Sequence, residues 1–280
     1  MEKIQNASMR GARHGALAGK TIVLTQAAEH AGMSLQATKG AGARVLVLPM
    51  IEFQPLADPA PLDLILSQLR EFQWVVFTSQ AAVRFFCSRL RELGRAVLDL
   101  PTPPKVAVIG ASTMGAASSE GLRIDFFAPG AHSGKEFAQE LSRHVRGQKL
   151  LLPQSDQARR DVGDILRESG ANVTSVVAYR TCMPKFVDRQ LLGRIRRDGA
   201  DVFVFASPSA FRNFADTVGQ ADLARFARDS AFAAIGPTTA ESIREAGLPV
   251  EIVAAKPSSE AVIHAVVEYF SKSRRTKSAL

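Results

Sequence analysis

The sequence has few cysteines and no long apolar run. Only two cysteines occur among its 280 residues, Cys87 and Cys182. Two are too few for a disulfide framework and are typical of a reducing compartment. No apolar run reaches the roughly 20 residues of a membrane-spanning helix. The residues before Gly19 lack the apolar stretch of about 7 to 15 residues that a signal peptide needs. We therefore expect a cytoplasmic protein with no membrane partner, in which residues 1–17 form a loose leader.

The usual signatures of metal, nucleotide and nucleic-acid binding are also missing. One tryptophan and two tyrosines do not supply the stacked aromatics of single-strand binding. The five histidines are scattered without metal-ligand spacing. The segment 130–136 resembles a phosphate-binding loop only superficially, because Glu136 stands where that motif has Ser or Thr. These absences argue against a metal site, a nucleotide cofactor and a nucleic-acid partner, even with a net charge of +8.

The two halves of the chain repeat one another. FTSQAAVRFF, which contains Ser79, returns as FASPSAFRNF, which contains Ser207. AVIGASTMGAA, which contains Gly110, returns as AAIGPTTAESI, which contains Gly236. The first pair of positions is 128 residues apart and the second 126. An offset this long and this constant indicates a duplicated unit of domain size, because solenoid repeats run only about 20 to 50 residues. The sequence therefore predicts two similar domains with one cleft between them.

Short apolar runs alternate with helix-length segments in both halves. This order is typical of a parallel sheet with helices on its faces. The expected strands are 21–25, 45–49, 74–78, 105–109, 150–153, 173–177, 201–206, 231–235 and 250–253. The predicted fold class is α/β, with a doubly wound parallel sheet in each of the two domains.

Two extended segments occupy equivalent places in the repeat. PMIEFQP (49–55) and VVAYRT (176–181) each follow the second strand of their half. A chain that leaves one domain and later returns needs two crossing segments, so we expect these two to form a two-stranded linker and the first strands to be exchanged between the repeats. The expected division is a leader at 1–17, a discontinuous domain at 18–48 plus 182–270, linker strands at 49–54 and 175–181, a continuous domain at 55–174 and a basic tail at 271–280.

Hydroxyl residues stand where strands give way to helices. IGAST and IGPTT place Thr113, Thr238 and Thr239 after a strand, and FTSQAA and FASPSA place Ser79 and Ser207 there. Such a hydroxyl can cap the following helix, and the free N–H groups of the first turn can bind an anion. Plain capping explains any one of them. Four such turns favour a ligand site, because open α/β sheets bind ligands at the carboxyl ends of their strands.

The segments FTSQAAVRFF, VVAYRT, FASPSAFRNF, IGPTTAESIREAGLPV and PSSEAV, in this order, resemble the uroporphyrinogen-III synthase family over about residues 19–268. The resemblance implies two α/β domains joined by a two-stranded linker. It implies cyclisation of linear hydroxymethylbilane to uroporphyrinogen III in haem biosynthesis, with inversion of ring D and loss of water. It further implies a monomeric hydro-lyase that uses no cofactor or metal and contacts the preceding enzyme of the pathway transiently.

The same resemblance assigns roles to individual residues. Tyr179 is the catalytic candidate, a hydrogen-bond donor to the departing hydroxyl, because an ordinary phenol with a pKa near 10 is neutral at neutral pH. The alternative is an aromatic residue that packs in the linker. The residues that match substrate-contacting turns are Ser79, Thr113, Ser207, Thr238 and Thr239. A substrate with eight carboxylates suits such helix N-termini, and a basic protein would meet it faster.

Two positions depart from the family pattern. Gln26 and Gln154 stand where the family often has arginine, and Arg159 and Arg180 are the candidates to compensate. The missing arginines favour a second hypothesis, a non-catalytic two-domain protein that binds or senses a tetrapyrrole or another polyanion. A third hypothesis, a nucleotide-dependent transferase, requires a phosphate loop that the sequence does not show.

Overall fold

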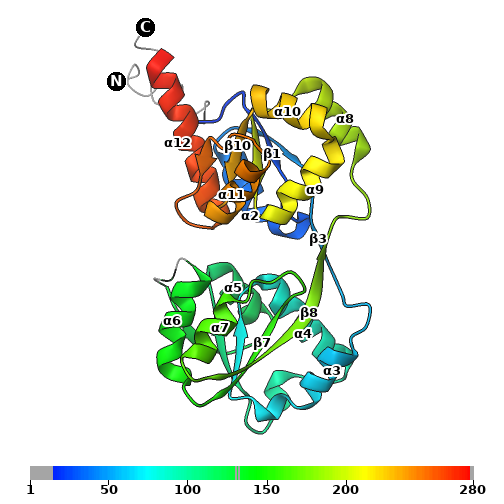
Figure 1. The fold of residues 1–280 in the computed structure, drawn as a ribbon, viewed down its shortest axis with the longest axis vertical. Coiled ribbons are helices and arrows are strands. Elements are labelled where there is room, and N and C mark those ends of the chain that lie inside the picture. Colours follow the sequence, from blue (N-terminus) through cyan, green and yellow to red (C-terminus); the bar gives the residue numbers. More distant parts are fainter. Residues whose placement is uncertain (1–14, 130, 132, 278–280) are drawn as a thin grey trace, which may run out of the picture. The chain divides into compact units, whose positions relative to one another are not determined.

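The computed structural model describes residues 15–129, 131 and 133–277, and the chain divides into two units. The continuous unit is Phe53–Cys182, and the discontinuous unit is Met1–Glu52 together with Met183–Leu280. In Figure 1 the continuous unit is coloured from cyan to green, whereas the discontinuous unit combines blue with yellow, orange and red. Each unit holds one sheet.

The continuous unit contains a six-stranded sheet in the order β3-β8-β7-β4-β5-β6. Its strands are β3 (Glu52–Gln54), β4 (Trp74–Phe77), β5 (Lys105–Val108), β6 (Ile124–Phe127), β7 (Lys149–Ser155) and β8 (Asn172–Cys182). Its helices are α3 (Ala60–Ser67), η3 (Leu69–Glu71), α4 (Gln80–Glu92), η4 (Val97–Asp99), α5 (Ala111–Ser119), α6 (Gly134–Val145) and α7 (Asp161–Glu168). Strands β4 to β8 pair in parallel. Their carboxyl ends therefore share one side of the sheet, the carboxyl edge.

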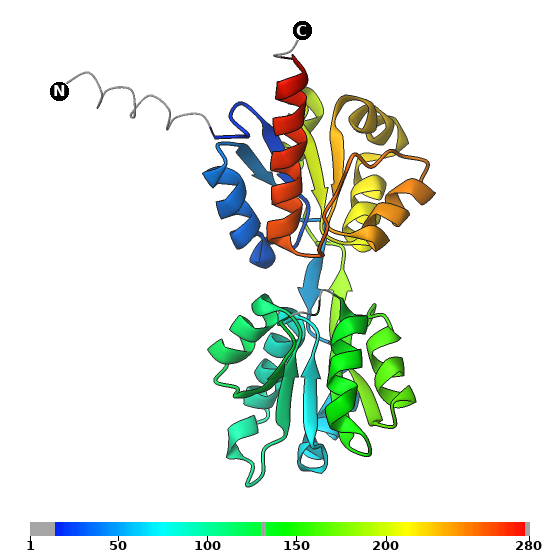
Figure 2. The same cartoon turned by 90° about the vertical axis from the view of Figure 1, so that its left-hand side faces the viewer.

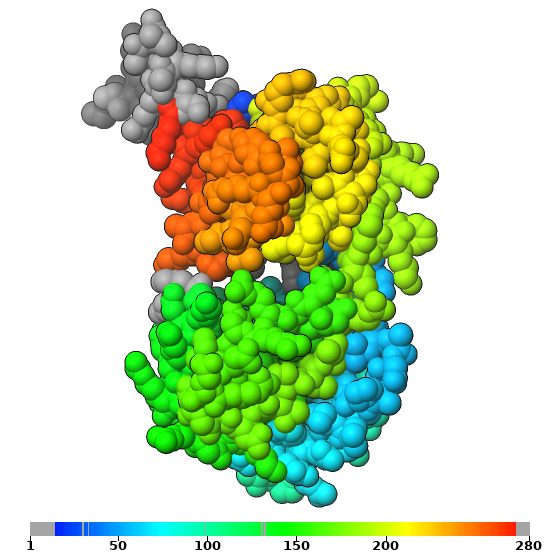
Figure 3. Space-filling model, viewed as in Figure 1, coloured from blue at the N-terminus to red at the C-terminus, as the bar shows by residue number. Residues whose placement is uncertain are grey.

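Alternating side chains bury both faces of this sheet. On β4, Val75 and Phe77 pack into a core that includes residues of α3, α4 and α5. Trp74 and Val76 of the same strand pack into a second core with residues of α6 and α7. Successive residues of a strand point to opposite faces, so a strand covered on both sides is apolar throughout. Figure 3 shows α6 and α7, in green, side by side on the surface of this unit.

The discontinuous unit contains a five-stranded parallel sheet in the order β11-β10-β9-β1-β2. Its strands are β1 (Thr21–Leu24), β2 (Arg44–Val47), β9 (Val202–Phe205), β10 (Ala231–Ala234) and β11 (Ile252–Val253). Its helices are η2 (Ala28–His30), α2 (Ala31–Gly40), α8 (Arg189–Asp198), α9 (Pro208–Val218), α10 (Gln220–Asp229), α11 (Pro237–Glu245) and α12 (Ser259–Lys277). This sheet has its own carboxyl edge.

The two faces of this sheet have different cores. One face packs aliphatic strand residues such as Ile22 against α12, which Figure 2 shows in red in front of the sheet. On the other face the ring of Phe203 lies 5.1 Å from that of Phe214 on α9 and 4.9 Å from that of Phe226 on α10. All three phenylalanines are buried. Helices on both faces make this unit doubly wound as well.

Each sheet combines the first two strands of one repeat with the later strands of the other. In the discontinuous unit β1 pairs with β9, with Ile22 opposite Val202. In the continuous unit β7, the counterpart of β1, pairs with β4, with Leu150 opposite Trp74. The predicted fold class, two doubly wound α/β domains with exchanged segments, is confirmed.

The structure differs from the expected element boundaries in three places. Residues 175–181, expected as a separate linker strand, are the second half of β8, which pairs with β7 as far as Tyr179. Strand β6 was not expected, and residues 271–277 of the expected basic tail continue α12. Residues 1–14 of the expected leader lie outside the described residues. Within the described part of the chain, no helix is long and apolar enough to cross a membrane.

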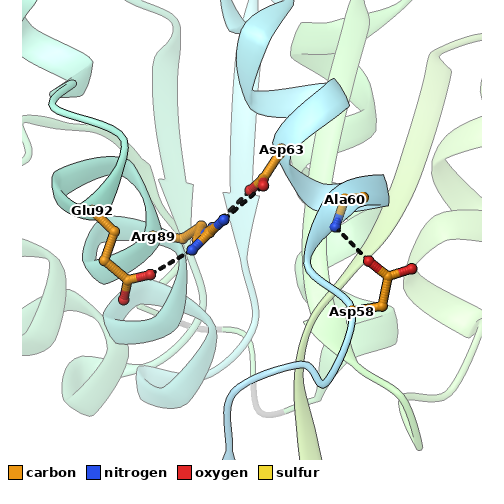
Figure 4. Close-up of polar contacts among 5 residues, drawn as sticks. All are labelled: Asp58, Ala60, Asp63, Arg89 and Glu92. Carbon is orange, nitrogen blue, oxygen red and sulfur yellow. Dashed lines mark hydrogen bonds and ion pairs between the residues drawn. The ribbon is translucent and has the colours of Figure 1, made fainter.

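Arg89 ties α4 to α3 (Figure 4). Its Nε and Nη2 donate to the two carboxylate oxygens of Asp63 at 2.7 and 2.6 Å, and its Nη1 donates to Glu92 at 2.6 Å. Ahead of α3, the carboxylate of Asp58 accepts the N–H of Ala60 at 3.0 Å. A bidentate arginine–carboxylate pair fixes orientation as well as distance. The pair therefore holds α4, the helix that begins at the carboxyl edge.

The Arg89 pair predicts a specific pH dependence of stability. The hydrogen bonds from Arg89 hold the pKa of Asp63 below its ordinary value of 3.8. A carboxyl whose folded pKa is lowered stabilises the fold above its unfolded pKa, and this contribution is lost as the pH falls through the folded pKa. We expect Asp63→Asn to lower the melting temperature at pH 7, and the difference from the wild type to shrink below about pH 4.

Thermal unfolding followed by circular dichroism from neutral to acidic pH measures this difference. Arg89→Met provides the matched background, because Asp63 has lost its partner there. In that background Asp63→Asn should produce no difference that narrows toward acid. The same narrowing in both backgrounds would show that Arg89 is not its cause.

Candidate functional site

Ser79 links the start of α4 to β8 at the carboxyl edge of the continuous unit. It follows β4 in an extended conformation, with φ −154° and ψ 153°, and its Oγ accepts the N–H of Ala82 at 3.0 Å. The same oxygen lies 3.1 Å from the Tyr179 hydroxyl oxygen, and either hydroxyl can donate. Ser79 therefore caps its helix and also contacts the predicted catalytic residue.

The ring of Tyr179 is held by two phenylalanines. Tyr179 lies near the end of β8, opposite Ser155 of β7, and only 5% of the residue is exposed. Its ring stacks on that of Phe85 of α4, with centroids 5.3 Å apart and planes 11° apart. Phe53 meets the ring edge-on, with centroids 5.5 Å apart. These contacts leave the ring one orientation, with its hydroxyl beside Ser79.

Burial is the main influence on the acidity of this phenol. It raises the pKa of Tyr179 above the ordinary value of 10.0, because the charged phenolate loses its solvation. The hydrogen bond with Ser79 lowers this pKa, the negative charge of Asp156 raises it and the positive charge of Arg84 lowers it. The net direction is upward, so Tyr179 is a neutral hydrogen-bond donor at neutral pH.

The loop after β7 fastens the end of β8. The N–H of Asp156 donates to the carbonyl of Tyr179 at 3.1 Å, and the carboxylate of Asp156 accepts the N–H of Thr181 at 2.9 Å. The hydroxyls of Ser155 and Thr181 lie 2.8 Å apart. Arg180 approaches Asp156 at 3.6 Å, and its side chain stays half exposed. This network fixes the backbone on both sides of Tyr179.

The turns IGAST and IGPTT each bury one hydroxyl and expose another. Thr113 in the first turn of α5 and Thr239 in the first turn of α11 are 5% and 2% exposed. The exposed hydroxyls of these turns are Ser112 and Thr238. Ser112 was not among the predicted site residues, although the alignment of the two turns places it opposite Thr238. Burial argues against a direct ligand contact by Thr113 or Thr239.

Ser207 and the IGPTT turn form a second group, in the discontinuous unit. Ser207 follows β9 and caps α9 by accepting the N–H of Ala210 at 3.0 Å. Strands β9 and β10 are parallel neighbours, so Ser207 and Thr238 follow adjacent strands at one edge. The structure thus brings together Ser79 and Tyr179 in one unit, and Ser207 and Thr238 in the other.

The glutamines and arginines noted in the sequence have different surroundings. Gln26 is buried, and its side-chain amide donates to Ser34 of α2 at 3.0 Å, so it serves the packing of that helix. Gln154 is half-buried on β7. The exposed side chain of Arg159 pairs with Asp161 at 3.2 Å. Among the described residues, no group of three His, Cys, Asp or Glu side chains is placed to hold a metal ion.

Comparison with known proteins gives one consistent result. The model of the family described as uroporphyrinogen-III synthase HemD matches residues 34–264. Uroporphyrinogen-III synthase from Synechococcus elongatus is 26% identical, with 90% of this chain and 96% of that protein covered. The same enzyme from Chlorobaculum parvum is 24% identical, with coverages of 84% and 92%. The crystal structure of uroporphyrinogen-III synthetase from Helicobacter pylori superimposes with a TM-score of 0.58 at 17% identity, covering 89% of this chain and 99% of that one. This structural similarity shows that the fold is shared.

The burial of Tyr179 is testable by titration. The chain has two tyrosines, so a Tyr269→Phe variant leaves Tyr179 as the only phenol. We expect its phenolate absorbance to appear with a midpoint above pH 10, because burial disfavours the charged form. The Tyr179→Phe variant, which reports Tyr269 alone, is the control. A midpoint for Tyr179 at or below 10 would contradict the buried environment.

Proposed function

Because the chain belongs to the uroporphyrinogen-III synthase family, we propose that it converts linear hydroxymethylbilane to uroporphyrinogen III with inversion of ring D. In this reaction the terminal hydroxyl takes up a proton and leaves as water, a carbon–carbon bond closes the macrocycle, and a pyrrole carbon releases the balancing proton. The observation that carries the proposal is the Tyr179 hydroxyl, held 3.1 Å from Ser79 at a carboxyl edge.

Tyr179 is the proposed catalytic residue. Its raised pKa keeps the phenol protonated at neutral pH, so it acts as a donor to the departing hydroxyl and not as a base. Ser79 Oγ accepts the N–H of Ala82 and can direct its own proton toward the Tyr179 oxygen. In that arrangement the proton of Tyr179 is free for the substrate. Hydrogen bonding to a leaving hydroxyl lowers the barrier to its departure.

The proposed carboxylate-binding groups are the first-turn N–H groups and exposed hydroxyls of the four turns. Ser112 and Thr238 are exposed where Thr113 and Thr239 are buried, so we assign the substrate contacts of these two turns to Ser112 and Thr238. Ser207 remains a candidate because it is only partly buried. Arg159 and Arg180 are exposed cations near β7 and β8, suited to the charge of a polycarboxylate.

The proposal includes a hydro-lyase that acts without a cofactor, as a monomer in the cytoplasm. Cyclisation with loss of water transfers no electrons, so positioning and proton transfer suffice. Both cysteines are free thiols, and burial raises the pKa of the Cys87 thiol to about 12. Unpaired cysteines support a reducing compartment. The expected transient contact with the preceding enzyme would limit the escape of an unstable linear substrate.

The product isomer tests the reaction directly. Purified protein receives freshly generated hydroxymethylbilane, the products are oxidised, and chromatography separates the type I and type III uroporphyrins. We expect type III to dominate, because spontaneous closure without inversion gives type I. A reaction without protein provides the background. Type I alone from demonstrably folded protein would exclude the synthase and leave a two-domain binding protein.

The catalytic role of Tyr179 predicts a large loss in a small substitution. Tyr179→Phe removes the hydroxyl and keeps the ring that stacks on Phe85. We expect the rate of type III formation to fall by more than about 100-fold, the range typical of a lost proton donor. Tyr269→Phe, at the other tyrosine, is the matched control. Wild-type turnover by Tyr179→Phe would remove Tyr179 from the mechanism.

A further inference from the structure

The serine caps of α4 and α9 are nearly identical. Ser79 and Ser207 lie 128 residues apart in the repeat, and each accepts the N–H of the residue three positions on at 3.0 Å. Their backbones agree closely, with φ and ψ of −154° and 153° at Ser79 and −164° and 159° at Ser207. As helix caps the two residues are equivalent. Any difference between their functions must come from their neighbours.

The neighbours are different. The position equivalent to Tyr179, 128 residues earlier, is Ile51, which is buried and carries no hydroxyl. The position equivalent to Phe85 is Asn213. Asn213 donates its side-chain amide to the carbonyl of Met50 at 2.7 Å, whereas Phe85 stacks on the ring of Tyr179. Both side chains hold the segment that follows the second strand of a repeat, but only one holds a phenol.

We propose that Ser79 is a positioning residue for Tyr179 and that this role is confined to one of the two repeated turns. The proposal rests on the proposed function. Phe85 sets the plane of the phenol ring, and Ser79 sets the direction of its hydroxyl. Ser79 is itself fixed, because its oxygen accepts the N–H of Ala82. A donor held in one direction loses little entropy when it meets its target.

The assignment changes the role of Ser79 from substrate contact to support. Its hydroxyl already has two partners, the N–H of Ala82 and the hydroxyl of Tyr179. Ser207, with the same cap and no tyrosine at the equivalent position, keeps the second side of its oxygen for a ligand. The duplicated turns therefore divide the work, with proton donation at Ser79 and carboxylate binding at Ser207.

A double-mutant cycle separates the two roles. The rate of type III formation is measured for Ser79→Ala and for Ser207→Ala, each in the wild type and in Tyr179→Phe. We expect Ser79→Ala to cost about three- to tenfold in the wild type, the effect of one lost hydrogen bond. In Tyr179→Phe it should cost less than about twofold, because no hydroxyl remains to be positioned. Ser207→Ala should cost the same factor in both backgrounds.

Two controls account for loss of the cap alone. Ser133→Ala removes a serine cap in the same unit, where Ser133 Oγ accepts the N–H of Glu136 at 3.2 Å. It should lower the melting temperature about as much as Ser79→Ala does and show no coupling to Tyr179→Phe. Ser79→Thr keeps both the cap and the hydroxyl and should restore most of the rate. Equal costs of Ser79→Ala in both backgrounds would overturn the proposal.

A readout that needs no turnover completes the test. In Tyr269→Phe the phenolate absorbance reports Tyr179 alone, and the hydrogen bond from Ser79 lowers the pKa of that phenol. Ser79→Ala should raise the titration midpoint, whereas Ser207→Ala should leave it in place, with Asp156 and Arg84 unchanged in both. An unchanged midpoint in Ser79→Ala would overturn the positioning role. A wild type that makes only type I would instead overturn the proposed function, and the raised midpoint would then describe a contact without catalytic meaning.

Discussion

The parallel pairing of exchanged strands is the constraint on which the rest of the structure depends. Strand β7 of the second repeat inserts between β8 and β4, and β4 belongs to the first repeat. This pairing places the end of β8 beside the turn that follows β4. Ser79 and Tyr179 are 100 residues apart in the chain and come from different repeats, yet they meet within one unit. Without the exchange, each repeat would keep its own first strands and this pair would not form.

The sequence predicted the sheets because a strand covered on both faces is apolar throughout. The expected strands all occur, and the offset between the repeats was sufficient to predict the exchange. Strand β6 was missed because Asp125 interrupts its apolar pattern, and the structure shows this carboxylate accepting the N–H of Val106 on the neighbouring strand. The linker at 175–181 was drawn too narrowly, because β7 continues to Ser155 and so extends its pairing with β8.

The candidate site was predicted in its turns and not in its packing. Spacing identified the caps Ser79 and Ser207, because a cap depends on local chain geometry. It could not separate Ser112 from Thr113, because which of two adjacent helical residues is buried depends on the rotation of the helix against the sheet. The stacking of Phe85 on Tyr179 joins distant segments. The contrast of Phe85 with Asn213 in the aligned repeats was the one sequence signal for it.

The exchanged strands also affect how the chain folds while it is being made. β1 leaves the ribosome long before its partner β9, and at about 5 to 20 residues per second the wait is on the order of ten to forty seconds. During that time β4 emerges, and its native partner β7 follows later still. β1 is the repeat counterpart of β7, so the first complementary strand that β4 meets is the wrong one. The native arrangement must prevail by its greater stability, because the order of synthesis favours the unexchanged pairing.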